Sequence, residues 1–145
     1  MKKRLLLAVL FAVFVVNGAI AGSGSLLGDW EGTARAILPE ELPGDGTAII
    51  TGITLEGTFV ELEKGLFRGE FTFDVPGIGL QEAYATGYIK AQKIQGVMSI
   101  DPGGGPVGIG LFEANLKGKK MTGVVRDLSD GSTTIFTAKK VKNSK

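Results

Sequence analysis

The chain has 145 residues, and it contains 23 glycines but no histidine and no cysteine. This length suits one domain, and the missing residues exclude the usual zinc ligands, the Ser-His and Cys-His nucleophile pairs and the commonest general base. The nearly balanced charge, 16 basic against 15 acidic side chains, lacks the basic excess of nucleic-acid binding proteins. We predict a protein that is not an enzyme, uses no cofactor or metal ion and does not bind nucleic acid.

The first 21 residues have the pattern of a secretory signal peptide. A basic segment at 2–4 precedes an unbroken apolar run at 5–16, and Ala19-Ile20-Ala21 supplies the small residues that signal peptidase accepts. The run is shorter than the roughly 20 apolar residues that a membrane-spanning helix needs. We predict cleavage after Ala21 and export to the periplasm or beyond the cell, with an uncleaved membrane anchor as the alternative. Cleavage would leave 13 basic and 15 acidic side chains.

Beyond a short linker at 22–27, the sequence predicts strands throughout. Apolar and polar residues alternate with a period of two, and no stretch sustains the helical spacing of apolar residues. An apolar residue, a short turn, an apolar residue and then glycine recur at 62–69, 89–96 and 116–123. Each copy is typical of a β-hairpin, and their constant spacing favours a meander. The predicted strands are 28–38, 47–62, 66–75, 81–90, 93–101, 107–117, 119–127 and 132–141, with a bulge at Gly57.

The alternation also predicts which face of each strand is buried. Large apolar residues, glycine and alanine share one face, and the opposite face carries most of the charged residues. An outer-membrane barrel turns its apolar face to lipid, where a basic residue at the midplane costs about 2–4 kcal/mol. The outward face has too many charges for that environment, and three Tyr and Trp residues are too few for two aromatic girdles. We therefore predict an all-β fold, a single soluble antiparallel up-and-down barrel at 28–141, followed by a basic tail at 142–145.

The inward face mixes bulky side chains with glycine and alanine, and this mixture has two explanations. The small residues relieve crowding and permit the sharp coiling that closure of a barrel requires, or they leave room for a guest. An eight-stranded barrel is just wide enough to be filled by side chains or to hold one small ligand. A small apolar ligand would enter between the loops at 39–46, 76–80, 102–106 and 128–131. The predicted lining residues are Phe71, Phe73, Ile100, Phe112 and Val125.

Gly28 and Trp30 form a Gly-x-Trp sequence at the start of the first predicted strand. This sequence resembles the opening of the lipocalin and calycin barrels, whose plan of long loops and tight turns is also similar. The resemblance implies that Trp30 plugs the closed end, that the looser loops surround an open end, and that the barrel binds a small apolar molecule. The chain departs from the lipocalin pattern near its C-terminus, where Lys139 and Lys140 stand in place of an arginine and no helix follows the last strand.

Three further motifs have simpler explanations than a catalytic or metal site. The segment 103–108 fits G-x-G-x-x-G, but its proline and the strand that follows leave no helix for a dinucleotide site. Asp127 and Asp130 lack the spacing of a calcium-binding loop and are typical of a turn. The carboxylate pairs at 40–41 and 61–63 lie in a loop and at a turn, so solvation explains them better than glycoside hydrolysis.

Some outward positions on the sixth, seventh, eighth and first predicted strands are apolar rather than polar. If the barrel closes, these strands are neighbours, and the residues would form one patch of the kind that marks an interaction surface. The residues are Ile37, Ile109, Leu111, Val124 and Ile135. We predict a homo-oligomer or a protein partner at this face. A structural or protein-interaction module with a filled core is therefore the alternative to a ligand-binding barrel.

Overall fold

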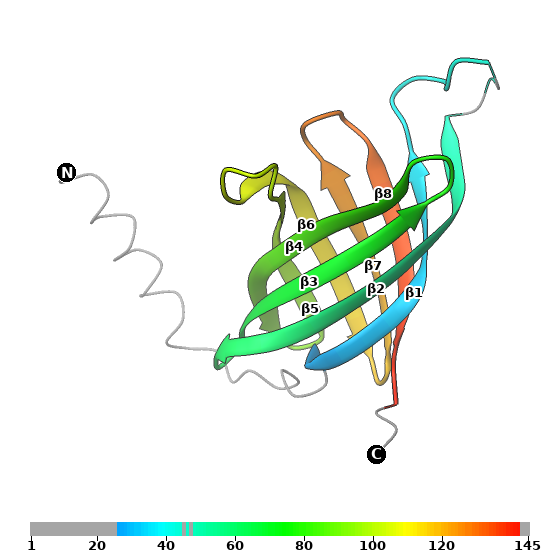
Figure 1. Cartoon of the computed structure of the whole chain (residues 1–145). Coiled ribbons are helices and arrows are strands. Elements are labelled where there is room, and N and C mark those ends of the chain that lie inside the picture. Colours follow the sequence, from blue (N-terminus) through cyan, green and yellow to red (C-terminus); the bar gives the residue numbers. More distant parts are fainter. Residues whose placement is uncertain (1–25, 45, 47, 143–145) are drawn as a thin grey trace.

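The computed structural model describes residues 26–44, 46 and 48–142 as a closed antiparallel barrel of eight strands (Figure 1). The strands are β1 (Gly28–Ile37), β2 (Ile49–Glu63), β3 (Leu66–Val75), β4 (Gly79–Lys90), β5 (Lys93–Ile100), β6 (Val107–Lys117), β7 (Lys120–Asp127) and β8 (Thr133–Lys140). Each strand pairs with the next along the chain, and β8 pairs with β1. The structure confirms the predicted all-β fold and the meander. The predicted signal peptide and nearly all of the linker lie outside the described residues.

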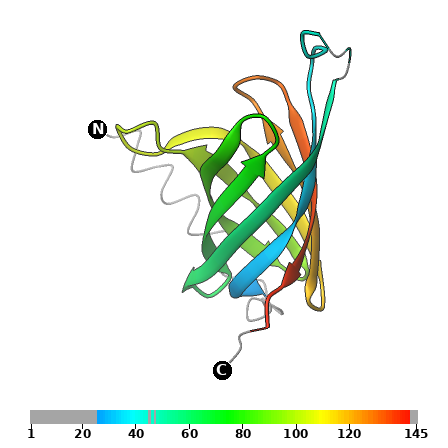
Figure 2. The same cartoon turned by 45° about the vertical axis from the view of Figure 1, so that its right-hand side comes forward.

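The two ends of the barrel differ in how the strands are joined (Figures 1 and 2). We call them the tight-turn end and the loop end. The tight turns are at 64–65, 91–92 and 118–119, close to the positions that the repeat predicts. The connections at the loop end are 38–48, 76–78, 101–106 and 128–132. Within the described ranges the chain begins and ends at the tight-turn end, and those ranges contain no helix that is long and apolar enough to cross a membrane.

One tight turn places alanine where the backbone favours glycine. Ala91 has a φ of +47° and follows the last residue of β4, just as Gly118, with a φ of +61°, follows the last residue of β6. A left-handed conformation costs an L-residue about 1–2 kcal/mol. Replacement by glycine removes this cost, but glycine also raises the chain entropy of the unfolded state, which offsets part of the gain. We predict that Ala91→Gly raises the free energy of unfolding by about 0.5–1 kcal/mol in urea denaturation. Gly118→Ala should lower it, and a destabilised Ala91→Gly variant would contradict the prediction.

The register of the long strand β2 is irregular at Gly52 and at Leu62 but not at Gly57, so the predicted bulge position was wrong. The register between β1 and β2 shifts where β2 contains one extra residue, and Gly52 has a φ of +75° there. Gly57 pairs regularly on both sides. A Cβ at Gly57 would lie 2.8 Å from Cε1 of Phe71, so this glycine makes room for an aromatic ring.

A bulge on β6 changes the predicted direction of one side chain, and the end of β5 exposes another. Met98 and Ser99 of β5 pair with Gly110 and Gly108 of β6, which leaves Ile109 as the extra residue. Bulges turn a strand and re-aim its side chains. Ile109, predicted to face outward, is half-buried and packs against the core. Ile100, predicted to line the interior, is the last residue of β5 and is 37% exposed.

The inward glycines allow neighbouring strands to approach each other closely. An added Cβ at any of several of them would overlap the backbone or Cβ atoms of a neighbouring strand. These glycines are Gly32, Gly87, Gly96, Gly110 and Gly123. Strands that approach this closely can coil tightly enough to close a small barrel. These glycines are therefore explained by the coiling that closes the barrel and not by space left for a ligand.

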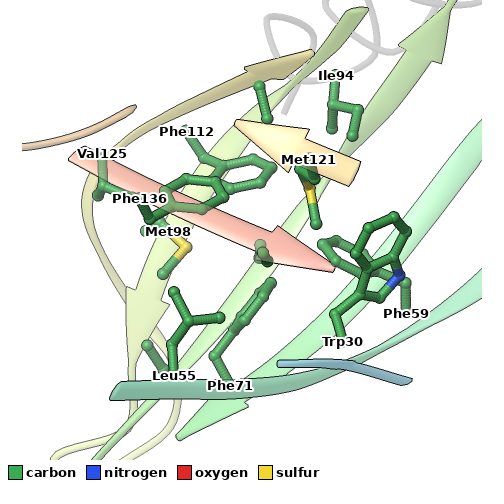
Figure 3. Packing of buried hydrophobic residues seen from close by; sticks show 14 of the residues in the cluster. Trp30, Leu55, Phe59, Phe71, Ile94, Met98, Phe112, Met121, Val125 and Phe136 are labelled. Atoms are coloured by element: carbon green, nitrogen blue, oxygen red, sulfur yellow. The ribbon is translucent and has the colours of Figure 1, made fainter. Parts of the chain in front are cut away.

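Five phenylalanine rings occupy the middle of the interior. Phe112 lies within 6.5 Å, between ring centroids, of each of the other four. The five are Phe59, Phe67, Phe71, Phe112 and Phe136, and none is more than 7% exposed. Figure 3 shows Phe112 against Phe136, and Trp30 close to Phe59. The barrel is therefore filled by its own side chains over most of its length.

Candidate functional site

Three aromatic rings form a floor below the loop end. Phe112 and Phe136 are stacked, with centroids 5.8 Å apart and an interplanar angle of 8°. Phe71 lies 6.2 Å from Phe112 with its ring tilted by 45°. Their rings come from β3, β6 and β8, and they are nearly fully buried. A molecule that enters from the loop end would meet this layer before it reached the deeper core.

Above the floor, the inner wall is apolar but incompletely covered. It is formed by Ile50, Phe73, Val75 and Ile109, which are half-buried and pack against the core. Phe73 stacks on Phe71 with centroids 6.2 Å apart. These residues stand near the loop-end termini of β2, β3 and β6. We call this wall and its floor the mouth.

Exposed apolar side chains surround the mouth. Ile78, in the β3–β4 connection, and Leu80, the second residue of β4, are 64% and 69% exposed, and Leu128, after β7, is 70% exposed. Covering the exposed area of these side chains with an apolar partner is favourable by about 25 cal/mol for each Å² removed from water. The rim is therefore suited to contact with an apolar molecule.

Aspartates hold two of the loops around the mouth. Asp101 Oδ1 accepts hydrogen bonds from the backbone amides of Gly103 and Gly105, at 2.8 and 3.1 Å. Asp130 Oδ1 accepts a hydrogen bond from the Ser132 amide at 2.7 Å. Such side-chain to backbone bonds fix turn conformations. Asp130, which the sequence analysis assigned to a turn, thus stabilises the turn between β7 and β8.

The predicted lining residues have three different positions. Phe71, Phe112 and Val125 are buried in the core, Phe73 is half-buried in the mouth, and Ile100 is exposed. Sequence reasoning did not select several residues that complete the mouth. These are Ile50, Val75, Ile109 and Phe136. The glycines at 108 and 110 were the available signal for Ile109, because glycine inside a strand often marks a bulge.

Trp30 lies at the tight-turn end, the end that the resemblance implied for it. Its side chain is 1% exposed, and its Nε1 donates a hydrogen bond of 2.7 Å to the backbone oxygen of Leu26. Lys140 Nζ lies 5.9 Å from the centroid of the Trp30 ring. A cation at this distance from an aromatic face is attracted to it. A lysine of β8 thus contacts the tryptophan that the resemblance placed near an arginine.

A hollow of about 320 Å³ lies outside the barrel, over β2, β3 and β4. Its lining is mainly polar and includes the carboxylates of Glu56, Glu70 and Glu82. In the described part of the chain, no group of three or more acidic side chains has an arrangement that could hold a metal ion. The hollow therefore differs from the apolar mouth in chemistry, and Phe71 is among the residues of both.

An ion pair interrupts the predicted outward patch. Val124 and Ile135 are directly opposite each other on β7 and β8, but Leu111 is opposite Arg126. Arg126 Nη1 donates a hydrogen bond of 2.8 Å to Glu113 Oε2. This bond and the arginine charge lower the pKa of Glu113 below its ordinary value. The pair thus stabilises the fold above the ordinary glutamate pKa, and this contribution is lost as the pH falls through the lowered pKa.

Ile37, Leu111 and Ile135 are 42–45% exposed, whereas Val124 is half-buried. Ile109 does not belong to the outward patch, because the bulge turns it toward the core. Arg126 and Glu113 are thus the direct cross-strand neighbours of Leu111 and Val124 on this face.

Comparisons with known proteins support the fold. No protein-family model and no curated protein matches the chain. Among solved structures, a redesigned β-barrel is similar with a TM-score of 0.62 and 12% identity, over 87% of this chain and all of that one. A mutant of the fluorescent protein UnaG has a TM-score of 0.46 and 10% identity, over 84% of this chain and all of that one. Rv2717c from M. tuberculosis also has a TM-score of 0.46, with 11% identity over 81% of this chain and 94% of that one. At such identities, the redesigned barrel shows the fold alone.

Proposed function

We propose that the protein is an exported binding barrel that takes a small apolar ligand in the mouth at its loop end. One observation carries the proposal. Apolar residues on the inner wall of the mouth are half-buried, although the side chains deeper on the same face are nearly fully buried. Covering such a wall with an apolar molecule is favourable by about 25 cal/mol for each Å² removed from water.

The filled core limits the depth at which the ligand binds. The floor of Phe71, Phe112 and Phe136 is formed by rings in mutual contact. A ligand therefore rests on the floor and extends to the rim, so part of it stays in water. This geometry favours a short or flat apolar molecule, or the apolar end of an amphiphile.

The charges around the mouth favour a ligand without negative charge. The loop end carries six acidic residues in the described ranges, Glu40, Glu41, Asp74, Asp101, Asp127 and Asp130. The basic residues nearest to this end of the strands are Arg35 and Arg126. Because like charges repel, an anionic head group at the rim is disfavoured. The proposed ligand class is thus a neutral or cationic apolar molecule.

A dye titration tests the proposal. We expect the neutral dye Nile red to gain fluorescence when it is added to the protein, and an anionic naphthalenesulfonate dye to bind more weakly. Phe73→Gln and Val75→Gln should each weaken Nile red binding about tenfold, because each replaces apolar contact area in the mouth. Leu62→Gln is the matched control, since Leu62 is 59% exposed beside the turn at 64–65, at the opposite end of the barrel. Circular dichroism checks that each variant is folded.

Two results would contradict the proposal: no dye enhancement with the folded protein, or equal loss of binding in the Leu62→Gln control. The remaining candidate would then be a protein-interaction module with a filled core. Two outward apolar cross-strand pairs favour that candidate, Val97 with Leu111 and Val124 with Ile135. Self-association through them would appear as a concentration-dependent mass in light scattering.

A further inference from the structure

The lysines of the barrel are gathered at one end. All nine lysines in the described ranges lie at or beside the tight turns or at the end of β8. They are Lys64, Lys90, Lys93, Lys117, Lys119, Lys120, Lys139, Lys140 and Lys142. The acidic residues at the same end are Asp29, Glu31, Glu61 and Glu63. The turns themselves bring these lysines together, because every second connection returns to the same end of a meander.

Several lysines directly face other lysines. Lys90 is paired with Lys93 across β4 and β5, and Lys120 is paired with Lys117 on one side and with Lys139 on the other. Like charges directly opposite each other destabilise a sheet. Lys139 Nζ forms an ion pair with Glu31 Oε1, at 3.3 Å. The arrangement therefore opposes folding of the free barrel, and an anion bound there would relieve the repulsion.

We infer that the tight-turn end docks on an anionic phospholipid surface through these lysines. The lysines belong to the β2–β3, β4–β5 and β6–β7 turns and to the end of β8, and these segments lie at the same end of the barrel. Each lysine near an anionic bilayer contributes to attraction, and four to eight clustered basic residues are typical of such a surface. Leu62 and Val141, 59% and 38% exposed beside Lys64 and Lys142, add apolar contact at the same end.

The apolar side chains at this end favour a membrane over other anionic partners. Leu62 and Val141 are exposed next to lysines, and apolar contact area together with basic charge is what strengthens binding to an anionic lipid surface. In contrast, the strands beside the lysines present few of the exposed aromatic side chains on which single-stranded nucleic acid stacks. Docking by this end would leave the mouth facing away from the bilayer.

Vesicle sedimentation tests the inference independently of the proposed ligand. We expect the purified protein to sediment with phosphatidylcholine vesicles that contain about one third phosphatidylglycerol, and not with phosphatidylcholine alone. Binding should be lost at about 0.5 M NaCl, where the Debye length is only a few ångströms. Lys93→Gln combined with Lys120→Gln should weaken binding about 25-fold, since each lysine near the surface contributes about a factor of five. The same double variant should be at least as stable as the parent, because it removes like-charge pairs.

A second double variant separates the lysine cluster from net charge. Gln81→Glu with Thr51→Glu changes the net charge by the same amount, but at exposed positions toward the loop end. Its binding should stay within about twofold of the parent protein, because the distance exceeds a Debye length. Equal sedimentation with neutral vesicles, equal weakening of both double variants, or tighter binding of a DNA duplex at the same salt concentration would overturn the inference. Loss of Nile red binding in the mouth variants would leave it unaffected.

Discussion

Gly87→Ala is expected to destabilise the barrel strongly. Gly87 on β4 is directly opposite Gly96 on β5, and an added Cβ would lie 2.6 Å from the Gly96 Cα and overlap the carbonyl oxygen of Gln95. Both obstacles are backbone atoms, so no side chain can rotate away from them. Overpacking of a well-packed core costs about 1–3 kcal/mol and occasionally more. Because β4 and β5 would have to separate, we expect a loss of about 3 kcal/mol or more, a large part of the stability of a small domain.

Gly108→Ala is the matched control for this prediction. A Cβ at Gly108 would lie 3.5 Å from Cγ1 of Val97, which is ordinary van der Waals contact. Circular dichroism in increasing urea should show a folded Gly108→Ala protein with nearly unchanged stability. A Gly87→Ala protein that unfolds at the same urea concentration would show that the strands do not approach as closely as described.

Phe112→Ala is expected to cost about 3–5 kcal/mol, the range for removal of a large aromatic side chain from a core. Phe112 is 2% exposed, and its ring lies near Phe59, Phe67, Phe71 and Phe136. Its removal would take away a contact that all four other rings share. Urea denaturation of the variant and the parent protein measures the difference.

The same substitution should create a dry apolar cavity in the middle of the barrel. Such cavities bind benzene, because apolar space of this size stays free of water. Benzene should therefore raise the midpoint of unfolding for Phe112→Ala and leave the parent protein nearly unchanged. A Phe112→Ala protein as stable as a Leu62→Ala control would show that the rings do not fill the interior.

The fold could be predicted from the sequence because its signals are local. Alternation of apolar and polar residues identified the strands, and the repeated hairpin pattern at 62–69, 89–96 and 116–123 identified the turns. With hairpins at constant spacing, an antiparallel meander follows directly, and its closure satisfies every strand edge. The observed strand boundaries lie within two residues of the predicted ones.

The site was harder to predict because it depends on how the strands coil against each other. The bulge at Ile109 turns this residue toward the core, and period-two reasoning cannot anticipate an extra residue. Ile100 is exposed because it is the last residue of β5. Whether small residues leave an empty space depends on rings from other strands, as at Gly57, where the Phe71 ring fills the gap. The lysine cluster is divided in the sequence among three turns and the end of β8, and the meander brings these segments to one end of the barrel.

Nuclear magnetic resonance of the labelled protein during a Nile red titration tests the central claim, binding above a filled core. The dye should shift the side-chain signals of Ile50, Phe73, Val75 and Ile109, which line the mouth. Phe59 and Phe67, which are 1% and 2% exposed below the floor, should keep their signals unchanged. Shifts at Phe59 and Phe67 would show that the ligand penetrates the core, and shifts confined to the outward face would place binding elsewhere. Either result would contradict the proposed mouth.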